Sequence, residues 1–232
     1  MSLPSDGQGE FVIRHFEEEL EELRRSLQEM SGLVETSIRC SVLSLAERDE
    51  KQAEVVLQNE SRINQMEIEI DDKATRLLAL DQPVARDLRF ILAAMKINSD
   101  LERMGDLAKG IVKRMRIVIQ DPVAKLPIDI PRMANLVQSM VRKALDSFLM
   151  KDVNLARDVL ASENAVDDLR DTIFQDLLGL MRQDPEHSSQ YVNLIFVAQN
   201  LERIVDHATN IAEDALYLAK GINVRHQAQV SI

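Results

Sequence analysis

The sequence is poor in the residues that build sheets, turns and disulfide frameworks. Its 232 residues include one Cys, no Trp, two Tyr, six Phe, seven Gly and six Pro. Sheet proteins are rich in aromatic and β-branched residues and need frequent turns, so a sandwich, a barrel or an α/β sheet is disfavoured. A lone Cys40 forms no intramolecular disulfide and excludes a cysteine-based zinc site.

The charge balance is acidic, with 39 Asp and Glu against 28 Lys and Arg and a formal net charge of −11. Such a surface repels nucleic-acid phosphates and anionic lipid headgroups, and it suits cations or basic partner surfaces. The longest uncharged stretch, 187–201, is too short and too polar to span a bilayer. The N-terminus also lacks the pattern of a secretory signal. We therefore expect a cytoplasmic protein that does not cross the membrane.

The apolar residues follow a helical period. In the first helix they recur at alternating steps of four and three, as at Leu20, Leu23 and Leu27. Prolines mark the breaks between helices, because proline lacks the backbone donor that a helix interior needs. Together these patterns predict six helices, at 10–47, 50–80, 84–120, 131–150, 152–183 and 188–220, with 121–131 as a linker.

An internal repeat organises these helices into two halves. LERMGDLAKGI (101–111) matches LERIVDHATNI (201–211) at an offset of 100, and 49–64 parallels 152–167 at an offset of 103. We therefore predict an all-α fold of two tandem, internally duplicated three-helix bundles. The expected division is a disordered tail (1–9), a first bundle (10–121), a second bundle (131–221) and a C-terminal tail (222–232).

The repeated segments carry pairs of carboxylates four residues apart, Glu102 with Asp106 and Glu202 with Asp206. Residues at this spacing project from one helix face, here at the edge of the buried stripe or outside it. Such pairs either share a cation or form a solvated charged face. Arg103 favours the second reading, as do Arg203 and Lys109.

The second and fifth helices add further oxygen donors at the same spacing, Glu60 with Asn64 and Glu163 with Asp167. All-oxygen sets suit hard cations such as Mg²⁺, Ca²⁺ and Mn²⁺, or oxygen-ligated iron. Exposed helix charges are the alternative. Arg170 stands where the repeat would match Glu67.

Catalytic arrangements are missing from the sequence. A di-iron carboxylate bundle needs Glu three residues before His, and none of the four histidines has one. The glycines are scattered and form no phosphate loop. His207 either reaches a neighbouring carboxylate or is an exposed or capping histidine. We therefore predict that the chain is not an enzyme.

Three segments are distinctive: FEEELEELRRSLQEMSGLVETSI (16–38), LLALDQPVARDLRFILAAMKINSDLERMGDLA (77–108) and LERIVDHATNIAED (201–214). They resemble the PhoU family of phosphate-signalling proteins. The resemblance extends in order over about 11–220. It implies two similar three-helix bundles in tandem and metal-binding motifs at Glu102 with Asp106 and at Glu202 with Asp206.

The same resemblance implies a function. The chain would be a negative regulator of the bacterial phosphate-starvation response, a metal-binding adapter between the ATPase subunit of the phosphate ABC transporter and a phosphate sensor histidine kinase. It would act as a cytoplasmic homodimer without nucleic acid. A metal-dependent enzyme or metal store is the alternative, and a scaffold without an ion is a third.

Two departures from the family pattern concern the first half. Lys109 and Gly110 stand where the family ends its motif with Asn, as Asn210 does in the second half. Asn64 is also a neutral and weaker ligand than Asp167. We therefore expect the first metal site to be weaker than the second, or empty.

Overall fold

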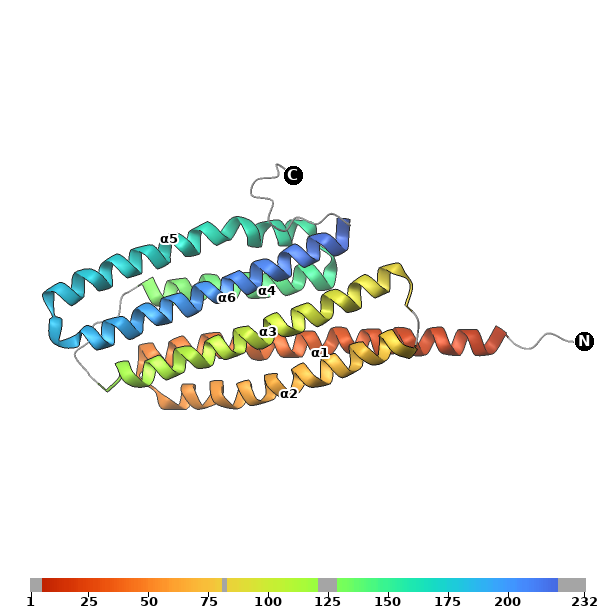
Figure 1. The fold of residues 1–232 in the computed structure, drawn as a ribbon, viewed down its shortest axis with the longest axis horizontal. Coiled ribbons are helices and arrows are strands. Elements are labelled where there is room, and N and C mark those ends of the chain that lie inside the picture. The colour runs from red at the N-terminus through yellow and green to blue at the C-terminus, as the bar shows by residue number, and fades with distance from the viewer. Residues whose placement is uncertain (1–5, 81–82, 121–128, 221–232) are drawn as a thin grey trace, which may run out of the picture.

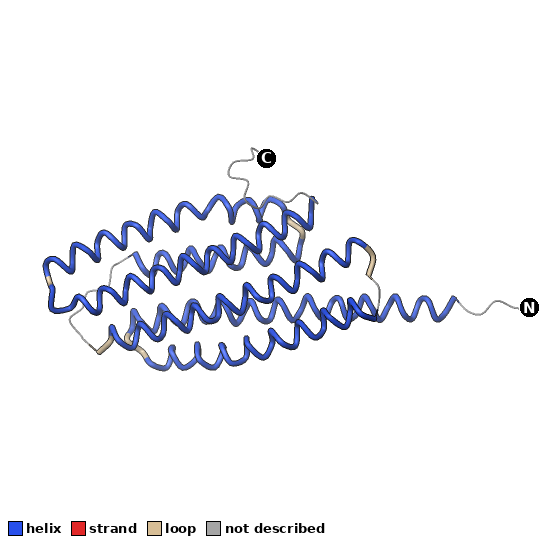
Figure 2. The backbone as a smooth tube through the Cα atoms, viewed as in Figure 1, coloured by secondary structure: helices blue, strands red, loops and turns tan. Residues whose placement is uncertain are grey.

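The computed structural model describes residues 6–80, 83–120 and 129–220, and these form helices and short turns without a strand (Figures 1 and 2). The helices are α1 (Asp6–Glu47), α2 (Glu50–Leu80), α3 (Ala85–Val118), α4 (Asp129–Met150), α5 (Val153–Gln183) and α6 (Ser188–Lys220), with a 3₁₀ turn, η1 (Pro185–His187), before α6. The predicted all-α class and the six helices are confirmed.

The helix ends differ from expectation at two places. Helix α1 begins at Asp6, so part of the predicted 1–9 tail is helical. Helix α4 begins at Asp129, two residues inside the predicted linker. The rest of that linker up to 128, residues 1–5 and the tail 222–232 lie outside the described residues. The domain boundaries therefore stay predictions.

Four helices form the centre of the molecule, and two flank it. Helices α1, α3, α6 and α4 contact one another in a closed ring, while α2 contacts α1 and α3, and α5 contacts α4 and α6. Figure 1 shows the result, with α2 along one side and α5 along the opposite side. The two bundles therefore share one core, and each half leaves its second helix on an outer face.

The duplication extends to the atomic detail of the turns. In the first half the Asp49 amide donates to Ser44 O, and in the second the Asp152 amide donates to Ser147 O. The residue before each Asp is left-handed, with φ of 54° at Arg48 and 56° at the equivalent lysine. Both Asp side chains then accept amide hydrogen bonds from the next helix, as N-caps do.

Helices α3 and α6 run antiparallel, and polar contacts join them across the two halves. His207 Nδ1 lies 2.8 Å from Asp100 Oδ1. At the positions equivalent by the 100-residue offset, the Asn200 side chain donates to Leu107 O at 3.5 Å. His207 therefore reaches a carboxylate of the other half, one of the two roles expected for it.

The same symmetry relates two contacts further from the centre of this helix pair. Lys96 Nζ lies 3.8 Å from an oxygen of the nearly buried Asp214. At the equivalent positions the Arg114 guanidinium lies over the Phe196 ring, 4.3 Å from its centroid. An ion pair at one position therefore corresponds to a cation–π contact at the symmetry-equivalent position, and both contacts join α3 to α6.

The few aromatic side chains also connect the halves. The buried rings of Phe90 on α3 and Phe148 on α4 stack with centroids 5.0 Å apart. The Arg24 guanidinium of α1 lies over the Phe90 ring, 3.9 Å from its centroid. Three helices from both halves therefore meet at one stack, which adds to the apolar burial that holds the core.

Gly105 of α3 packs closely against Ile63 of α2, so Gly105→Ala is expected to lower the melting temperature. An added Cβ would lie 3.0 Å and 3.3 Å from two side-chain carbons of buried Ile63. Branching at its Cβ restricts how Ile63 can move. Gly179→Ala is the control, because nothing lies within 4 Å of its added Cβ. It should gain up to ~1 kcal/mol of helix propensity.

Thermal unfolding followed by far-ultraviolet circular dichroism measures both variants. We expect the melting temperature to fall for Gly105→Ala and to rise for Gly179→Ala. An equal rise in both would contradict the tight contact between α2 and α3.

Candidate functional site

The predicted ligand residues lie along two helix contacts, α2 with α3 and α5 with α6. Glu60 and Asn64 on α2 face the motif residues of α3, and Glu163 and Asp167 on α5 face those of α6. The first acidic cluster comprises Glu60, Asn64, Glu67, Glu102 and Asp106, and the second comprises Glu163, Asp167, Glu202 and Asp206. Because α2 and α5 lie on opposite sides, the clusters do too (Figure 1).

In the first cluster a lysine from α3 reaches the carboxylate of α2. Lys109 Nζ lies 2.5 Å from Glu60 Oε1, and the Asn64 amide donates to the same oxygen at 3.0 Å. The Glu60 side chain is 11% exposed, so this ion pair is largely shielded from water. Asn64 Oδ1 is buried and, among the described residues, receives no hydrogen bond.

The charges of the first cluster act on one another. Burial raises the pKa of Glu102, and the negative charges of Asp106 and Glu67 raise it further. Burial also acts to raise the pKa of Glu60, but the hydrogen bonds from Lys109 and Asn64 outweigh it and lower that pKa. The Glu60 hydrogen bond in turn raises the pKa of Lys109. The lysine thus stabilises one carboxylate and leaves Glu102 repelled by its neighbours.

In the second cluster an arginine from α5 bridges the two helices. Arg170 Nη1 donates to Glu202 Oε1 at 2.9 Å and to Asp167 Oδ1 at 3.1 Å. Its Nη2 and Nε donate to Asp171 Oδ1 at 2.9 Å and 3.1 Å. One guanidinium therefore holds three carboxylates, two of which belong to the predicted metal ligands.

Several carboxylates of the second cluster nevertheless repel one another. Burial raises the pKa of Glu163, and Asp167 and Asp206 raise it further. Burial and then Asp206 raise the pKa of Glu202, against the opposing effect of Arg170. Desolvation likewise raises the pKa of Asp206. The guanidinium therefore offsets part of the negative charge that the fold gathers here.

The sequence pattern drew attention to Lys109 and Arg170 but did not predict that they contact the candidate ligand residues Glu60, Asp167 and Glu202. In the sequence, Lys109 is an ordinary compensating charge and Arg170 is a departure from the repeat. The sequence feature that could have indicated these contacts is the position of each residue beside candidate ligands. Lys109 follows a repeated Glu–Asp pair, and Arg170 stands three residues after Asp167. The motif carboxylates lie at the edge of the buried stripe or outside it, as the helical angles predicted, with Glu102 and Glu202 half-buried and Asp106 and Asp206 exposed.

The donor atoms of both clusters suit a hard cation, but their side chains are not arranged around one. The donors are oxygen atoms, the carboxylates repel one another, and Asn64 offers a buried acceptor without a donor. Within the described residues, however, no three Asp, Glu, His or Cys side chains are placed to hold a metal ion together. In both clusters a basic side chain contacts the oxygens that a metal would need.

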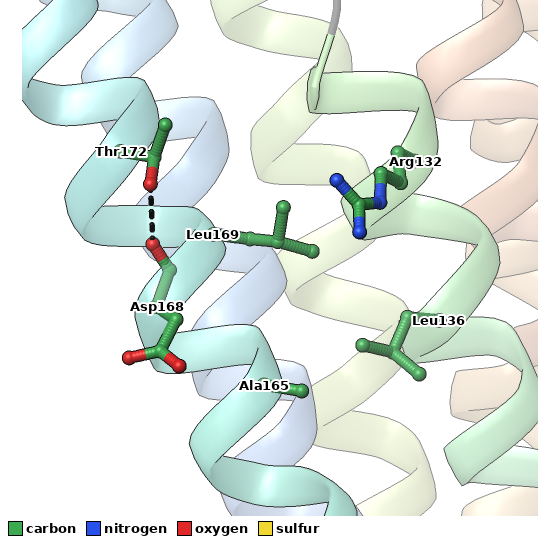
Figure 3. Close-up of a pocket in the computed structure, with 6 residues that line it drawn as sticks. All are labelled: Arg132, Leu136, Ala165, Asp168, Leu169 and Thr172. Atoms are coloured by element: carbon green, nitrogen blue, oxygen red, sulfur yellow. Dashed lines mark hydrogen bonds between the residues drawn. The ribbon is translucent and has the colours of Figure 1, made fainter.

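Two pockets flank α5. One of about 490 Å³ lies between α4 and α5 and is lined by Arg132, Leu136, Ala165, Asp168, Leu169 and Thr172 (Figure 3). The Thr172 hydroxyl donates a hydrogen bond to the Asp168 backbone oxygen, so it is not free to bind a ligand (Figure 3). The lining of the pocket is mostly apolar. A second pocket of about 240 Å³ lies between α5 and α6, where Arg170 and Phe174 line it beside the second acidic cluster.

Comparison with known proteins matches both halves to one family. The model of the PhoU domain matches residues 27–115 and again residues 130–215, one copy in each bundle. The chain belongs to the PhoU family. This confirms the family resemblance and the duplicated architecture predicted from the sequence.

Individual PhoU relatives match over nearly their whole length. The chain is 40% identical over 205 residues to the phosphate-specific transport system accessory protein PhoU homolog of Caulobacter vibrioides, covering 88% of this chain and 89% of the relative. The crystal structure of PhoU from Pseudomonas aeruginosa has a TM-score of 0.85 at 38% identity, covering 89% of this chain and 100% of the other. That of the phosphate transport system regulatory protein PhoU from Streptococcus pneumoniae has a TM-score of 0.83 at 30% identity, covering 90% and 99%.

No helix in the described part of this PhoU-family chain is both long and apolar enough to cross a membrane.

The repulsion within the second cluster has a measurable effect on stability. With a chelator present, Glu163→Gln is expected to raise the melting temperature at neutral pH, because it removes a charge that its neighbours destabilise. A carboxyl whose pKa is higher in the folded state destabilises that state above both pKa values. The penalty disappears as the pH falls from the folded to the unfolded pKa.

The advantage of Glu163→Gln should therefore shrink on acidification, as thermal unfolding over a pH series will show. Asp168→Asn serves as the matched control, since Asp168 is exposed and lies on the same helix beside the α4–α5 pocket (Figure 3). A Glu163→Gln protein no more stable than wild type at neutral pH would contradict the repulsion.

Proposed function

We propose that this PhoU-family chain is a phosphate-transport accessory protein that acts as a negative regulator of the bacterial phosphate-starvation response. It is a non-enzymatic adapter between the ATPase subunit of the phosphate ABC transporter and a phosphate sensor histidine kinase. The observation that carries the proposal is the double PhoU-domain match over both bundles. The names of the relatives, which describe transport-system accessory and regulatory proteins, support it.

The physical means of this role is an elongated helical body with acidic outer faces. The net charge of −11 favours docking onto basic surfaces of cytoplasmic partners. Self-association into a homodimer belongs to the same proposal. The described residues contain buried helix contacts and surface ion pairs and no arrangement that we can assign to catalysis.

Metal binding is the second part of the proposal. Glu60, Asn64, Glu102 and Asp106 would hold an ion in the first half, and Glu163, Asp167, Glu202 and Asp206 in the second. The ion would be Mg²⁺, Mn²⁺, Ca²⁺ or iron, since all donors are oxygens. It would neutralise the clusters and could bridge the chain to a partner carboxylate.

Complementation tests the regulatory role. The chain is expressed in a bacterium that lacks its own PhoU gene and carries a reporter of a phosphate-starvation promoter. We expect repression to return in phosphate-rich medium and the reporter to stay active in phosphate-poor medium. Continued reporter activity in rich medium, with normal amounts of folded protein, would refute the role.

Pull-down with the transporter ATPase and the kinase, with and without chelator, tests the partners. Capture of both proteins supports the adapter, and loss of capture with chelator assigns the metal to docking. A metal store is the alternative function, favoured by the oxygen-rich clusters. It predicts several ions per chain and no effect on the reporter.

A further inference from the structure

Each acidic cluster contains a basic side chain that is hydrogen-bonded to at least one of its carboxylates. The first gathers the carboxylates of Glu60, Glu67, Glu102 and Asp106, and the second those of Glu163, Asp167, Glu202 and Asp206. In the first half this cation is Lys109, and in the second it is Arg170.

The two cations come from opposite helices of their bundles. Lys109 lies on α3, and its equivalent on α6 is the uncharged Thr209. Arg170 lies on α5, and its equivalent on α2 is Glu67. The cation that is hydrogen-bonded to a cluster carboxylate therefore comes from a different helix in each half. In the first cluster Arg103 adds an ion pair with Glu102, with Nε 3.6 Å from Oε2.

Each cation occupies the oxygens that would otherwise bind a metal. Arg170 Nη1 lies 2.9 Å from Glu202 and 3.1 Å from Asp167, with its side chain only 30% exposed. Lys109 contacts Glu60 at 2.5 Å with similar shielding. Charge-assisted hydrogen bonds of this kind hold strongly in a partly desolvated setting. A metal ion and the basic side chain cannot both use the same lone pairs.

We propose that Lys109 and Arg170 are built-in counter-cations that compete with a divalent cation for the two acidic clusters. They offset part of the negative charge when no metal is bound, and a metal ion must displace them to coordinate the carboxylates that they contact. In the first half displacement also frees Glu60 beside the unpaired Asn64 Oδ1. In the second it moves Arg170 at the wall of the α5–α6 pocket, which includes Phe174. This inference rests on the metal-binding part of the proposed function.

Removal of each counter-cation tests the competition. Calorimetric titration of the full chain with Mg²⁺ and with Mn²⁺ compares the wild type with Arg170→Gln and Lys109→Gln. Each variant should bind the ion about tenfold more tightly, because the metal no longer has to break a charge-assisted hydrogen bond. Arg170→Lys, which keeps the charge, should return towards the wild-type affinity.

Arg62→Gln is the charge-matched control. Arg62 lies on α2, the helix that carries Glu60, but its guanidinium pairs with Glu29 at 3.4 Å and with Glu69 at 3.2 Å, outside both clusters. It loses the same positive charge, and long-range attraction screened by salt should change its affinity by less than about twofold.

Thermal unfolding provides a second measurement without a titration. In chelator, Arg170→Gln and Lys109→Gln should melt at lower temperature than Arg62→Gln, because each leaves a partly buried carboxylate without its cation. Added Mn²⁺ should then raise the melting temperature of the two cluster variants more than that of the control.

The outcomes separate this inference from the proposed function. Metal binding by the wild type with no tightening in either cluster variant overturns the competition and leaves the function intact. If the cluster variants bind the ion and the wild type does not, the competition is supported, but metal binding is not part of the wild-type function. No binding by any protein overturns both the competition and the metal-binding part, while the reporter assay still tests the adapter.

Discussion

The antiparallel pairing of α3 with α6 is the constraint on which the rest of the structure depends. Each helix carries its half's Glu–Asp motif on one edge and must bury its apolar stripe, with Leu101 and Leu201 fully inside. Packing the two stripes against each other and against α1 and α4 gives one shared core. The motif carboxylates are then left facing outward, toward α2 on one side and α5 on the other.

The approximate two-fold symmetry of this pairing explains which residues could change and which could not. At two equivalent positions the polar contacts differ: His207 meets the Asp100 carboxylate, whereas Asn200 donates to the Leu107 carbonyl. Either contact is sufficient, because it only has to satisfy polar groups between the helices. The acidic edges are more constrained. Burial and neighbouring carboxylates raise the pKa of Glu102 in the first cluster and of Glu163 and Glu202 in the second. The fold tolerates this repulsion because a lysine or an arginine lies among the carboxylates.

Much of this architecture was predictable from the sequence, because its signals are local and periodic. The helical period and the prolines located six helices, and the repeat predicted two equivalent halves. The sequence also indicated that Glu102 and Glu202 lie near the surface, because helix geometry places both at a fixed angle from the buried apolar stripe. Helix α1 was underestimated by four residues, because its start at Asp6 lies in a polar segment without a clear apolar pattern.

The partner of each charge was not predictable in the same way. Along the chain Lys109 lies closest to Asp106 among the acidic residues of its cluster, whereas its contact with Glu60 joins residues 49 positions apart. Arg170 similarly meets Glu202 across 32 positions. Such pairs depend on the rotation of α2 against α3 and of α5 against α6, which side-chain packing sets and local spacing does not.

One shared core predicts that the two halves unfold together. Hydrogen exchange measured by mass spectrometry over a denaturant series compares peptides from α2, which contacts only first-half helices, with peptides from α5, which contacts only second-half elements. The account predicts that both lose protection at the same denaturant concentration. Loss of protection in one half while the other remains folded would contradict it.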